Sequence, residues 1–137
     1  MLELSVPARQ DMLLVIRMTL SGLCARCGMG LDEVENARIA SDEACYCLLN
    51  QSAAVERLRM ICEWTDERLD IIMEAIRPTA AEPRETAHDP EIARCILETL
   101  IGDVRLSHDA LGVYAIHMGL EVGTLREARN GGGTDGV

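Results

Sequence analysis

The chain has 137 residues, about the size of one ordinary domain, so we expect a single hydrophobic core. Hydrophobic residues make up 48% of the sequence, and no apolar run approaches the roughly 18 residues that span a bilayer, which excludes a transmembrane protein. With 13 basic and 23 acidic residues the formal net charge is −10, which disfavours non-specific nucleic-acid binding because phosphates need neutralisation.

The N-terminal stretch MLELSVPARQDM lacks the basic region and apolar run of a secretory signal, so we expect a cytoplasmic protein. In that compartment the six cysteines are expected to be reduced thiols. Cys24 and Cys27 form a CxxC pair inside a helical apolar pattern, which favours small core residues over a metal or redox site. No spacing of Cys or His predicts a metal centre. All the basic residues are Arg, which excludes chemistry that needs a lysine.

Residues 2–6 alternate apolar and polar positions before Pro7, which predicts an edge strand. A helical pattern follows from about residue 9 to 27. Its core face consists of Leu13, Ile16, Leu20, Leu23, Cys24 and Cys27. A second apolar stripe consists of Leu14, Val15, Met18 and Gly22. One stripe is enough to dock a helix on its own domain, so the second suggests that another chain covers it; the alternative is a helix buried on both sides within one domain. Arg17 and Ser21 lie between the stripes.

Gly28 and Gly30 end this helix, and Asp32 is expected to cap a second helix that runs to about Gln51. The core face of the second helix consists of small or apolar residues, Val34, Ala37, Ser41, Ala44, Cys45 and Leu48. Polar residues and a thiol occupy another side, at Asn36, Glu43, Cys47 and Asn50. Alternation in residues 55–64 and 68–76, around a turn at Asp66-Glu67, then predicts a hairpin.

Residues 77–89 contain two prolines and predict a loop. Asp89 followed by Pro90 predicts the start of a third helix, which ends near Gly102. Two strands are expected at 104–107 and 113–118 around a turn at 108–110, and residues 123–137 are expected to form a disordered tail. The order β-α-α-β-β-α-β-β predicts an α+β fold in one domain, residues 1–122, with helices on one face of a mostly antiparallel sheet.

Four stretches, in this order and spacing, resemble the anti-sigma-factor serine kinases of the RsbW and SpoIIAB type: SVPARQDMLLVIRMTLSGL, GLDEVENARIASDEAC, DERLDIIM and LETLIGDVRL. These kinases belong to the GHKL ATPase superfamily. The resemblance covers roughly residues 3–120. It implies a histidine-kinase-like ATPase domain with the Bergerat nucleotide-binding fold, a two-layer α/β sandwich.

The resemblance also implies a nucleotide site, but its motifs are degenerate in this chain. In the family one helix supplies a Glu as general base and, four residues on, an Asn that holds magnesium; here Glu43 keeps the base position and Cys47 stands at the metal position. Asn50 would need a helix shift to replace that ligand. The adenine-recognising Asp-x-Gly motif aligns with Ala75 and Arg77. The Gly-rich phosphate lid aligns with DPEIA, ending at Ala93, which has two acids and no glycine.

The loss of these motifs together favours a pseudo-kinase that needs no cofactor, in which Glu43 is expected to be vestigial; weak or altered nucleotide binding stays open. It is expected to bind a sigma factor, a STAS anti-anti-sigma protein or an intact kinase homologue, as a homodimer or heterodimer. The family uses an Arg at the position of Arg17 for such contacts, which makes Arg17 with Leu14, Val15 and Met18 the expected partner surface. A solvated Arg17 beside a homodimer face is the alternative. The alternative function is an active serine kinase that phosphorylates a STAS partner with Glu43 as base.

Overall fold

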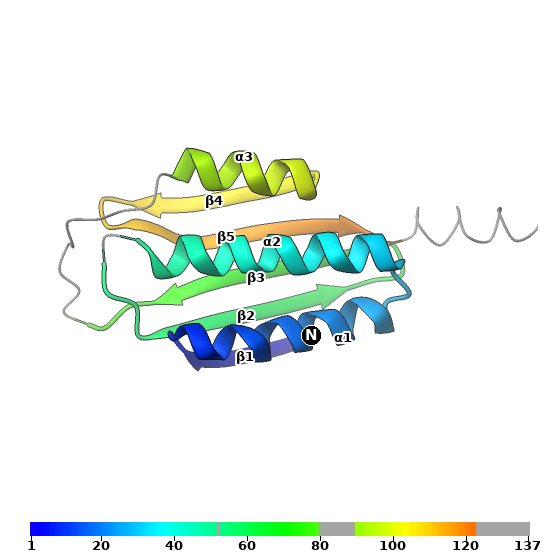
Figure 1. Cartoon of the computed structure of the whole chain (residues 1–137), viewed down its shortest axis with the longest axis horizontal. Coiled ribbons are helices and arrows are strands. Elements are labelled where there is room, and N and C mark those ends of the chain that lie inside the picture. The colour runs from blue at the N-terminus through cyan, green and yellow to red at the C-terminus, as the bar shows by residue number, and fades with distance from the viewer. Residues whose placement is uncertain (52, 80–89, 123–137) are drawn as a thin grey trace, which may run out of the picture.

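The computed structural model describes residues 1–51, 53–79 and 90–122. Its elements are, in chain order, β1 (Leu2–Pro7), the short 3-10 helix η1 (Gln10–Met12), α1 (Leu13–Arg26), α2 (Leu31–Leu49), β2 (Arg57–Trp64), β3 (Arg68–Ile76), α3 (Pro90–Leu100), β4 (Asp103–Asp109) and β5 (Gly112–Glu121). In this part of the chain the strands form one antiparallel sheet in the order β1-β2-β3-β5-β4. The three helices cover one face of the sheet (Figure 1). The predicted α+β sandwich is therefore confirmed.

The core lies between the sheet and the helices, and strict alternation in the hairpin strands builds its floor. Each second residue of β2 up to Cys62 and of β3 is buried, at Leu58, Met60, Cys62, Leu69, Ile71, Met73 and Ala75, whereas Trp64 at the end of β2 is exposed. Side chains of alternate strand residues point to opposite faces, so the intervening residues face away from the helices. The chain contains no Phe, and sulfur-containing and aliphatic side chains fill the core instead.

Helix α2 lies over the middle of the sheet, between α1 and α3 (Figure 1). Small buried residues, Ala37, Ala40, Ser41, Ala44 and Cys45, let it approach both the sheet and its neighbouring helices. Being enclosed on three sides, α2 buries Cys45 and Cys47 alike, although these two side chains leave the helix in different directions. The predicted core face of α2 is confirmed.

Two local predictions are wrong. Helix α2 begins at Leu31 after Gly30, and no side chain caps it, so Asp32 lies in the first turn, where its charge still favours the helix N-terminus. Gly28, with φ 80°, makes the reversal between α1 and α2 that only glycine adopts freely. The turn between β4 and β5 lies at residues 110–111 rather than 108–110, because Asp109 Oδ1 accepts the N–H of Leu111 at 3.0 Å.

Helix α1 separates its two stripes as the periodicity predicts. Ile16, Leu20, Leu23, Cys24 and Cys27 are buried, whereas Leu14, Val15 and Met18 are 58%, 40% and 64% exposed. The alternative interpretation, a helix buried on both sides within one domain, is therefore wrong. None of the helices that the structure describes is long and apolar enough to cross a membrane. The predicted capping residue Asp89 and the predicted disordered tail, 123–137, lie outside the described residues.

Candidate functional site

The helix position expected to hold magnesium is a buried thiol. Cys47 is 2% exposed, and burial, with the nearby charge of Glu43 adding to it, raises the pKa of the thiol to about 11. At neutral pH the group is therefore an uncharged, soft sulfur, whereas magnesium prefers oxygen ligands. Glu43, one turn earlier on α2, is partly exposed and stays in reach of solvent.

The positions expected to recognise adenine and phosphate carry methyl groups. Ala75 is 8% exposed and lies on the core side of β3, opposite Leu58 of β2. Ala93 is fully buried in α3. Helix α3 begins at Pro90, which lacks a backbone N–H, so one of the donors that a helix N-terminus offers to an anion is missing. Glu91 adds a negative charge to the same turn.

Arg77 is at the centre of a polar cluster that the sequence did not predict. Its Nε donates to Gln51 Oε1 at 2.7 Å, and its Nη1 and Nη2 donate to the two carboxylate oxygens of Asp109 at 2.6 and 3.0 Å. Nη2 also reaches the carbonyl of Gly112 at 3.3 Å, and the guanidinium carbon lies 5.7 Å from the ring centre of Tyr114. Hydrogen bonding to Arg77 holds the pKa of Asp109 below its ordinary value.

Gln51 makes this cluster part of the scaffold. It is 3% exposed, and its Nε2 donates to the carbonyls of Leu48 and Val113, both at 2.8 Å. The side chain thereby joins the end of α2 to β5 and presents its Oε1 to Arg77. The Arg77 side chain itself is only 16% exposed, so its charge is enclosed by the residues it binds. We call Gln51, Arg77 and Asp109 the Arg77 cluster.

On α1 the structure places Arg17 beside an acid that the sequence analysis missed. Arg17 Nε and Nη2 donate to the two carboxylate oxygens of Asp42 on α2, at 3.2 and 3.1 Å. Arg38 Nη1 reaches the same carboxylate at 3.4 Å. Arg17 and Asp42 stay 35% and 32% exposed. The spacing of Arg38 and Asp42 on one helix was visible in the sequence, but their contact with Arg17 depends on how α1 packs on α2.

Leu14, Val15 and Met18 of α1 form exposed apolar surface beside the Arg17–Asp42 pair. Helix α2 adds Ile39 and Tyr46, which are 38% and 45% exposed. Apolar side chains around a guanidinium and a carboxylate are the composition found at protein interfaces. The structure therefore brings the predicted partner residues together on one side of the helix layer, next to a charged pair.

The cysteines behave as core residues where the sequence predicted it. Cys24 and Cys27 are 0% and 4% exposed, and burial raises the pKa of Cys24 to about 12, with the neighbouring thiols adding to the effect. All six cysteines are free. In residues 1–51, 53–79 and 90–122, no group of three or more His, Cys, Asp and Glu side chains is arranged to hold a metal ion.

Comparison with known proteins gives one consistent relationship. No family model matches the chain. It is similar to proteins named serine-protein kinase RsbW from Bacillus cereus (strain AH187), Bacillus thuringiensis (strain Al Hakam) and Bacillus anthracis (strain CDC 684 / NRRL 3495). Each is 23% identical over 124 residues, which cover 79% of this chain and 78% of the relative. The chain is thus a distant homologue of these serine-protein kinases over most of the length of both.

Proposed function

We propose that this protein is an anti-sigma-factor-like regulator that acts by binding a sigma factor or a STAS anti-anti-sigma protein, and that it has lost ATP binding. The homology to RsbW kinases supports the class of partner and the Bergerat type of the fold. The proposal includes a homodimer or a heterodimer with an intact kinase homologue. It also includes a cytoplasmic location, because sigma factors act on transcription.

The observation that carries the loss of ATP binding is the Arg77 cluster. The family motif needs a glycine at this position so that the backbone can approach the base. Here a guanidinium stands instead, and it is bound to Gln51 and Asp109. Moving it aside for a nucleotide would leave the buried Gln51 Oε1 without its donor, which opposes binding by about 1–3 kcal/mol.

The remaining positions support the same conclusion. Cys47 is a buried neutral thiol, Ala75 has no group that could accept the adenine amino group, and Ala93 lies in the core. Magnesium and a triphosphate therefore do not fit the residues at these positions. Glu43 would remain as a carboxylate without a substrate to act on.

Partner binding is assigned to the exposed stripe of α1. Burying a large apolar side chain contributes roughly 1.5–3 kcal/mol, and Leu14, Val15 and Met18 are all available for this in the isolated chain. Arg17 offers a planar guanidinium beside them, and an acidic group of a partner could share or replace Asp42.

An active serine kinase is the second candidate, since Glu43 is retained and partly exposed, and the relatives are named serine-protein kinases. The two candidates differ in a thermal-shift titration with MgATP. A ligand at about 100 times its dissociation constant stabilises a protein by about 2.7 kcal/mol, and we expect no magnesium-dependent shift at millimolar nucleotide.

Phosphate transfer from labelled ATP to the STAS protein encoded nearest in the genome complements this titration, with Glu43→Gln as the control variant. Transfer that Glu43→Gln abolishes would establish the kinase and refute the pseudo-kinase. Pull-down of the sigma factor and of the STAS protein tests the other half of the proposal, which fails if neither is retained.

A further inference from the structure

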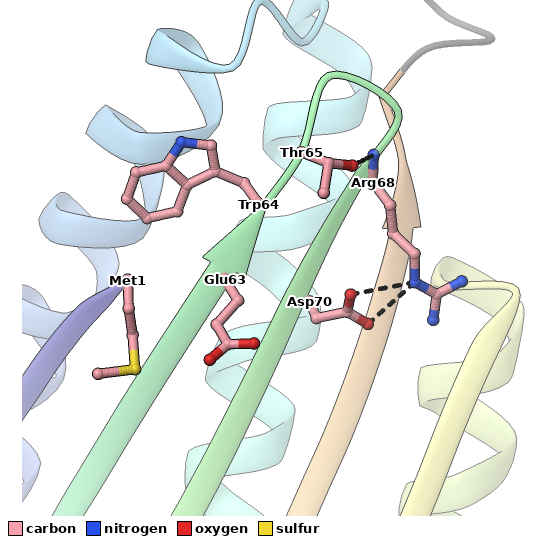
Figure 2. Close-up of a pocket in the computed structure, with 6 residues that line it drawn as sticks. All are labelled: Met1, Glu63, Trp64, Thr65, Arg68 and Asp70. Carbon is pink, nitrogen blue, oxygen red and sulfur yellow. Dashed lines mark hydrogen bonds and ion pairs between the residues drawn. The ribbon is translucent and has the colours of Figure 1, made fainter.

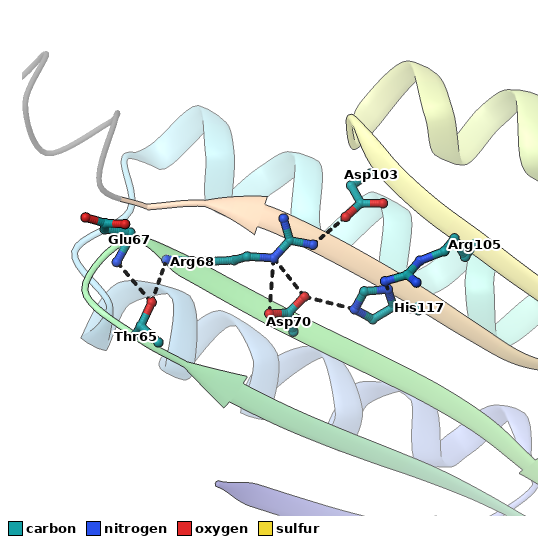
Figure 3. Close-up of polar contacts among 7 residues, drawn as sticks. All are labelled: Thr65, Glu67, Arg68, Asp70, Asp103, Arg105 and His117. Carbon is teal, nitrogen blue, oxygen red and sulfur yellow. Dashed lines mark hydrogen bonds and ion pairs between the residues drawn. The ribbon is translucent and has the colours of Figure 1, made fainter.

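The face of the sheet that no helix covers carries a histidine with a polar partner on each ring nitrogen. His117 of β5 stands directly opposite Arg105 of β4, and Arg105 Nη2 lies 2.8 Å from its Nδ1. On the other side of the ring, Nε2 lies 2.9 Å from Oδ1 of Asp70 on β3. Figure 3 shows the ring between these two side chains, and the His117 side chain is only 19% exposed.

We propose that His117 is a proton-sensitive latch, which holds Arg105 of the edge strand β4 while the ring is neutral and releases it when the ring takes up a second proton. The inference goes beyond the proposed function, because the latch involves neither α1 nor the Arg77 cluster. It follows from the donor and acceptor roles at the ring, from the charges around it and from the place of β4 in the sheet.

The two partners fix the protonation state of the ring. A guanidinium has N–H donors and no acceptor, so Nδ1 must accept the hydrogen bond from Arg105 and carries no proton. An ionised carboxylate only accepts, so Nε2 must carry the proton that it donates to Asp70. Both contacts are therefore made together only by the neutral ring with its proton on Nε2. A second proton, at Nδ1, would set an N–H against the N–H of Arg105 and one cation against another.

The contact with Asp70 would survive the second proton, so the loss is confined to Arg105. A cationic ring would donate to Asp70 through a charge-assisted hydrogen bond, which is stronger than the bond of the neutral ring. Asp70 also accepts from Arg68 Nε at 2.9 Å (Figure 2). Because a guanidinium stays charged in proteins, this second contact does not depend on the proton.

Charged residues from each neighbouring strand lie on the same face of the sheet as His117. They are Arg68, Asp70 and Glu74 on β3, Asp103 and Arg105 on β4, Glu121 on β5 itself, and Arg59 and Glu63 on β2. Arg59 pairs with Glu74, and Arg68 pairs with Asp70 and Asp103. Within the described residues, Asp70 and Arg105 are the groups of this set that bond to the ring nitrogens. The second proton therefore acts directly on Arg105.

The latch affects β4 because this strand is the last in the order β1-β2-β3-β5-β4 and, in the described part of the chain, pairs with a neighbour on one side only. Two side-chain connections cross β5 to reach it. In the first, Arg68 of β3 passes over Gly119 to Asp103, a path that a Cβ at Gly119 would block. The contacts of His117 form the second. Proton uptake breaks the second connection and leaves the first intact.

The released guanidinium has an acid within reach. Asp103 lies two residues before Arg105 on the same face of β4. Hydrogen bonding to Arg68, with the charge of Arg105 adding to it, holds the pKa of Asp103 below its ordinary value. This carboxylate thus stays charged at the pH at which histidines gain a second proton. We expect Arg105 to turn from β5 toward Asp103, at the free edge of the sheet.

The test follows His117 and Arg105 by NMR between about pH 8 and about pH 5, where histidine side chains change charge. The ring signals are assigned by their absence in His117→Gln, and the guanidinium signals by their absence in Arg105→Leu. We expect the guanidinium signals of Arg105 to change with the same midpoint as the ring signals of His117. In His117→Gln the guanidinium signals should stay constant.

Two variants should move the midpoint of the ring titration in opposite directions. Arg105→Leu should raise it by about half a unit or more, because the cation and the donor that oppose the second proton are gone. Asp70→Asn should lower it. The matched control is Arg57→Leu, which removes the same charge from the same face, where Arg57 bonds to the hydroxyl and carbonyl of Ser5, and it should move the midpoint much less.

Ring signals that titrate while those of Arg105 stay constant would overturn the proposal, as would a ring that does not titrate in this range. Equal shifts of the midpoint in Arg105→Leu and Arg57→Leu would also overturn it. A guanidinium response that persists in His117→Gln would assign that response to another group and remove the latch. Met18→Asp should keep the wild-type titration, so a failure of the latch is distinguishable from a failure of the proposed α1 interface.

Discussion

Arg17 and Arg77 make the same kind of contact, a guanidinium bonded twice to one aspartate, in two different surroundings. The Arg17–Asp42 pair bridges α1 and α2 at the surface, with about a third of each side chain exposed. The Arg77 side chain is half as exposed and also bonds the buried Gln51. Exposed ion pairs contribute little to stability, whereas leaving an enclosed polar group without its partner is costly.

Under the proposed function, this difference would let one domain bind a partner through Arg17 while the Arg77 cluster opposes a nucleotide. An acidic group of a partner could replace the carboxylate beside Arg17 with little loss, because solvent screens the Arg17–Asp42 pair in the free chain. The Arg77 cluster resists such an exchange, since Gln51 depends on it for a donor and also holds α2 to β5. Arg77 is thus part of the scaffold.

The largest expected effect on folding comes from Arg77→Ala. Removing the guanidinium leaves Gln51 Oε1 without its donor and Asp109 without its ion pair, so we expect a loss of about 1–3 kcal/mol in the free energy of unfolding. Urea denaturation measures it. The matched control is Arg9→Ala, which removes an exposed pair with Asp11 and should change stability by less than about 1 kcal/mol. Equal losses in the two variants would contradict the enclosed role of Arg77.

Met18→Asp should have the largest effect on association. A charge at a side chain that is 64% exposed leaves the fold intact, but it prevents burial of the α1 stripe, so partner affinity should fall tenfold or more. Pull-down and sedimentation measure the two kinds of association. Ile92→Asp changes an exposed apolar residue of α3 in the same way and should leave both unchanged. If Met18→Asp stays folded and binds as before, the stripe is not an interface.

Local periodicity was enough to predict most of this architecture. The hairpin of β2 and β3 alternates strictly, and the two stripes of α1 have the exposure that their spacing predicts. Errors occurred where two local signals compete. At the start of α2, Gly30 and Asp32 both suit a helix N-terminus, and the turn that Gly28 makes decides for Gly30.

The charged clusters could not be predicted, because their members are distant in sequence. Arg17 meets Asp42 across 25 residues, and Arg77 meets Gln51 and Asp109 across 26 and 32 residues. The resemblance to the RsbW-type kinases predicts that Arg77 stands at the position of a family glycine. It could not show what the guanidinium would bind, since that depends on where the end of α2 and the β4–β5 turn meet.

Arg17→Ala should have a smaller effect than Met18→Asp, and on a different property. Stability should change by less than about 1 kcal/mol, because the Arg17–Asp42 pair is screened by solvent and Asp42 keeps its contact with Arg38. Affinity for an acidic partner surface should fall about threefold, while self-association through the apolar stripe stays the same. Loss of self-association in Arg17→Ala would place the guanidinium in a homodimer seam instead.

The smallest expected effect is the pH dependence that Asp109 contributes. Arg77 lowers the pKa of Asp109 in the folded protein, so the folded state holds the charged carboxylate more favourably than the unfolded chain does. The resulting stability is present above the ordinary aspartate pKa of about 3.9 and is lost as the pH falls through the lowered value. The difference in stability between the wild type and Asp109→Asn should therefore shrink as the pH falls below about 4, when both are followed by urea denaturation. In an Arg77→Ala background, the narrowing for Asp109→Asn should be smaller, because only the backbone N–H groups of Leu111 and Gly112 then lower the pKa of Asp109. A difference that is constant with pH in the wild-type background would show that Arg77 does not act on Asp109 through charge, and the comparison of the two arginines would then rest on Gln51 alone.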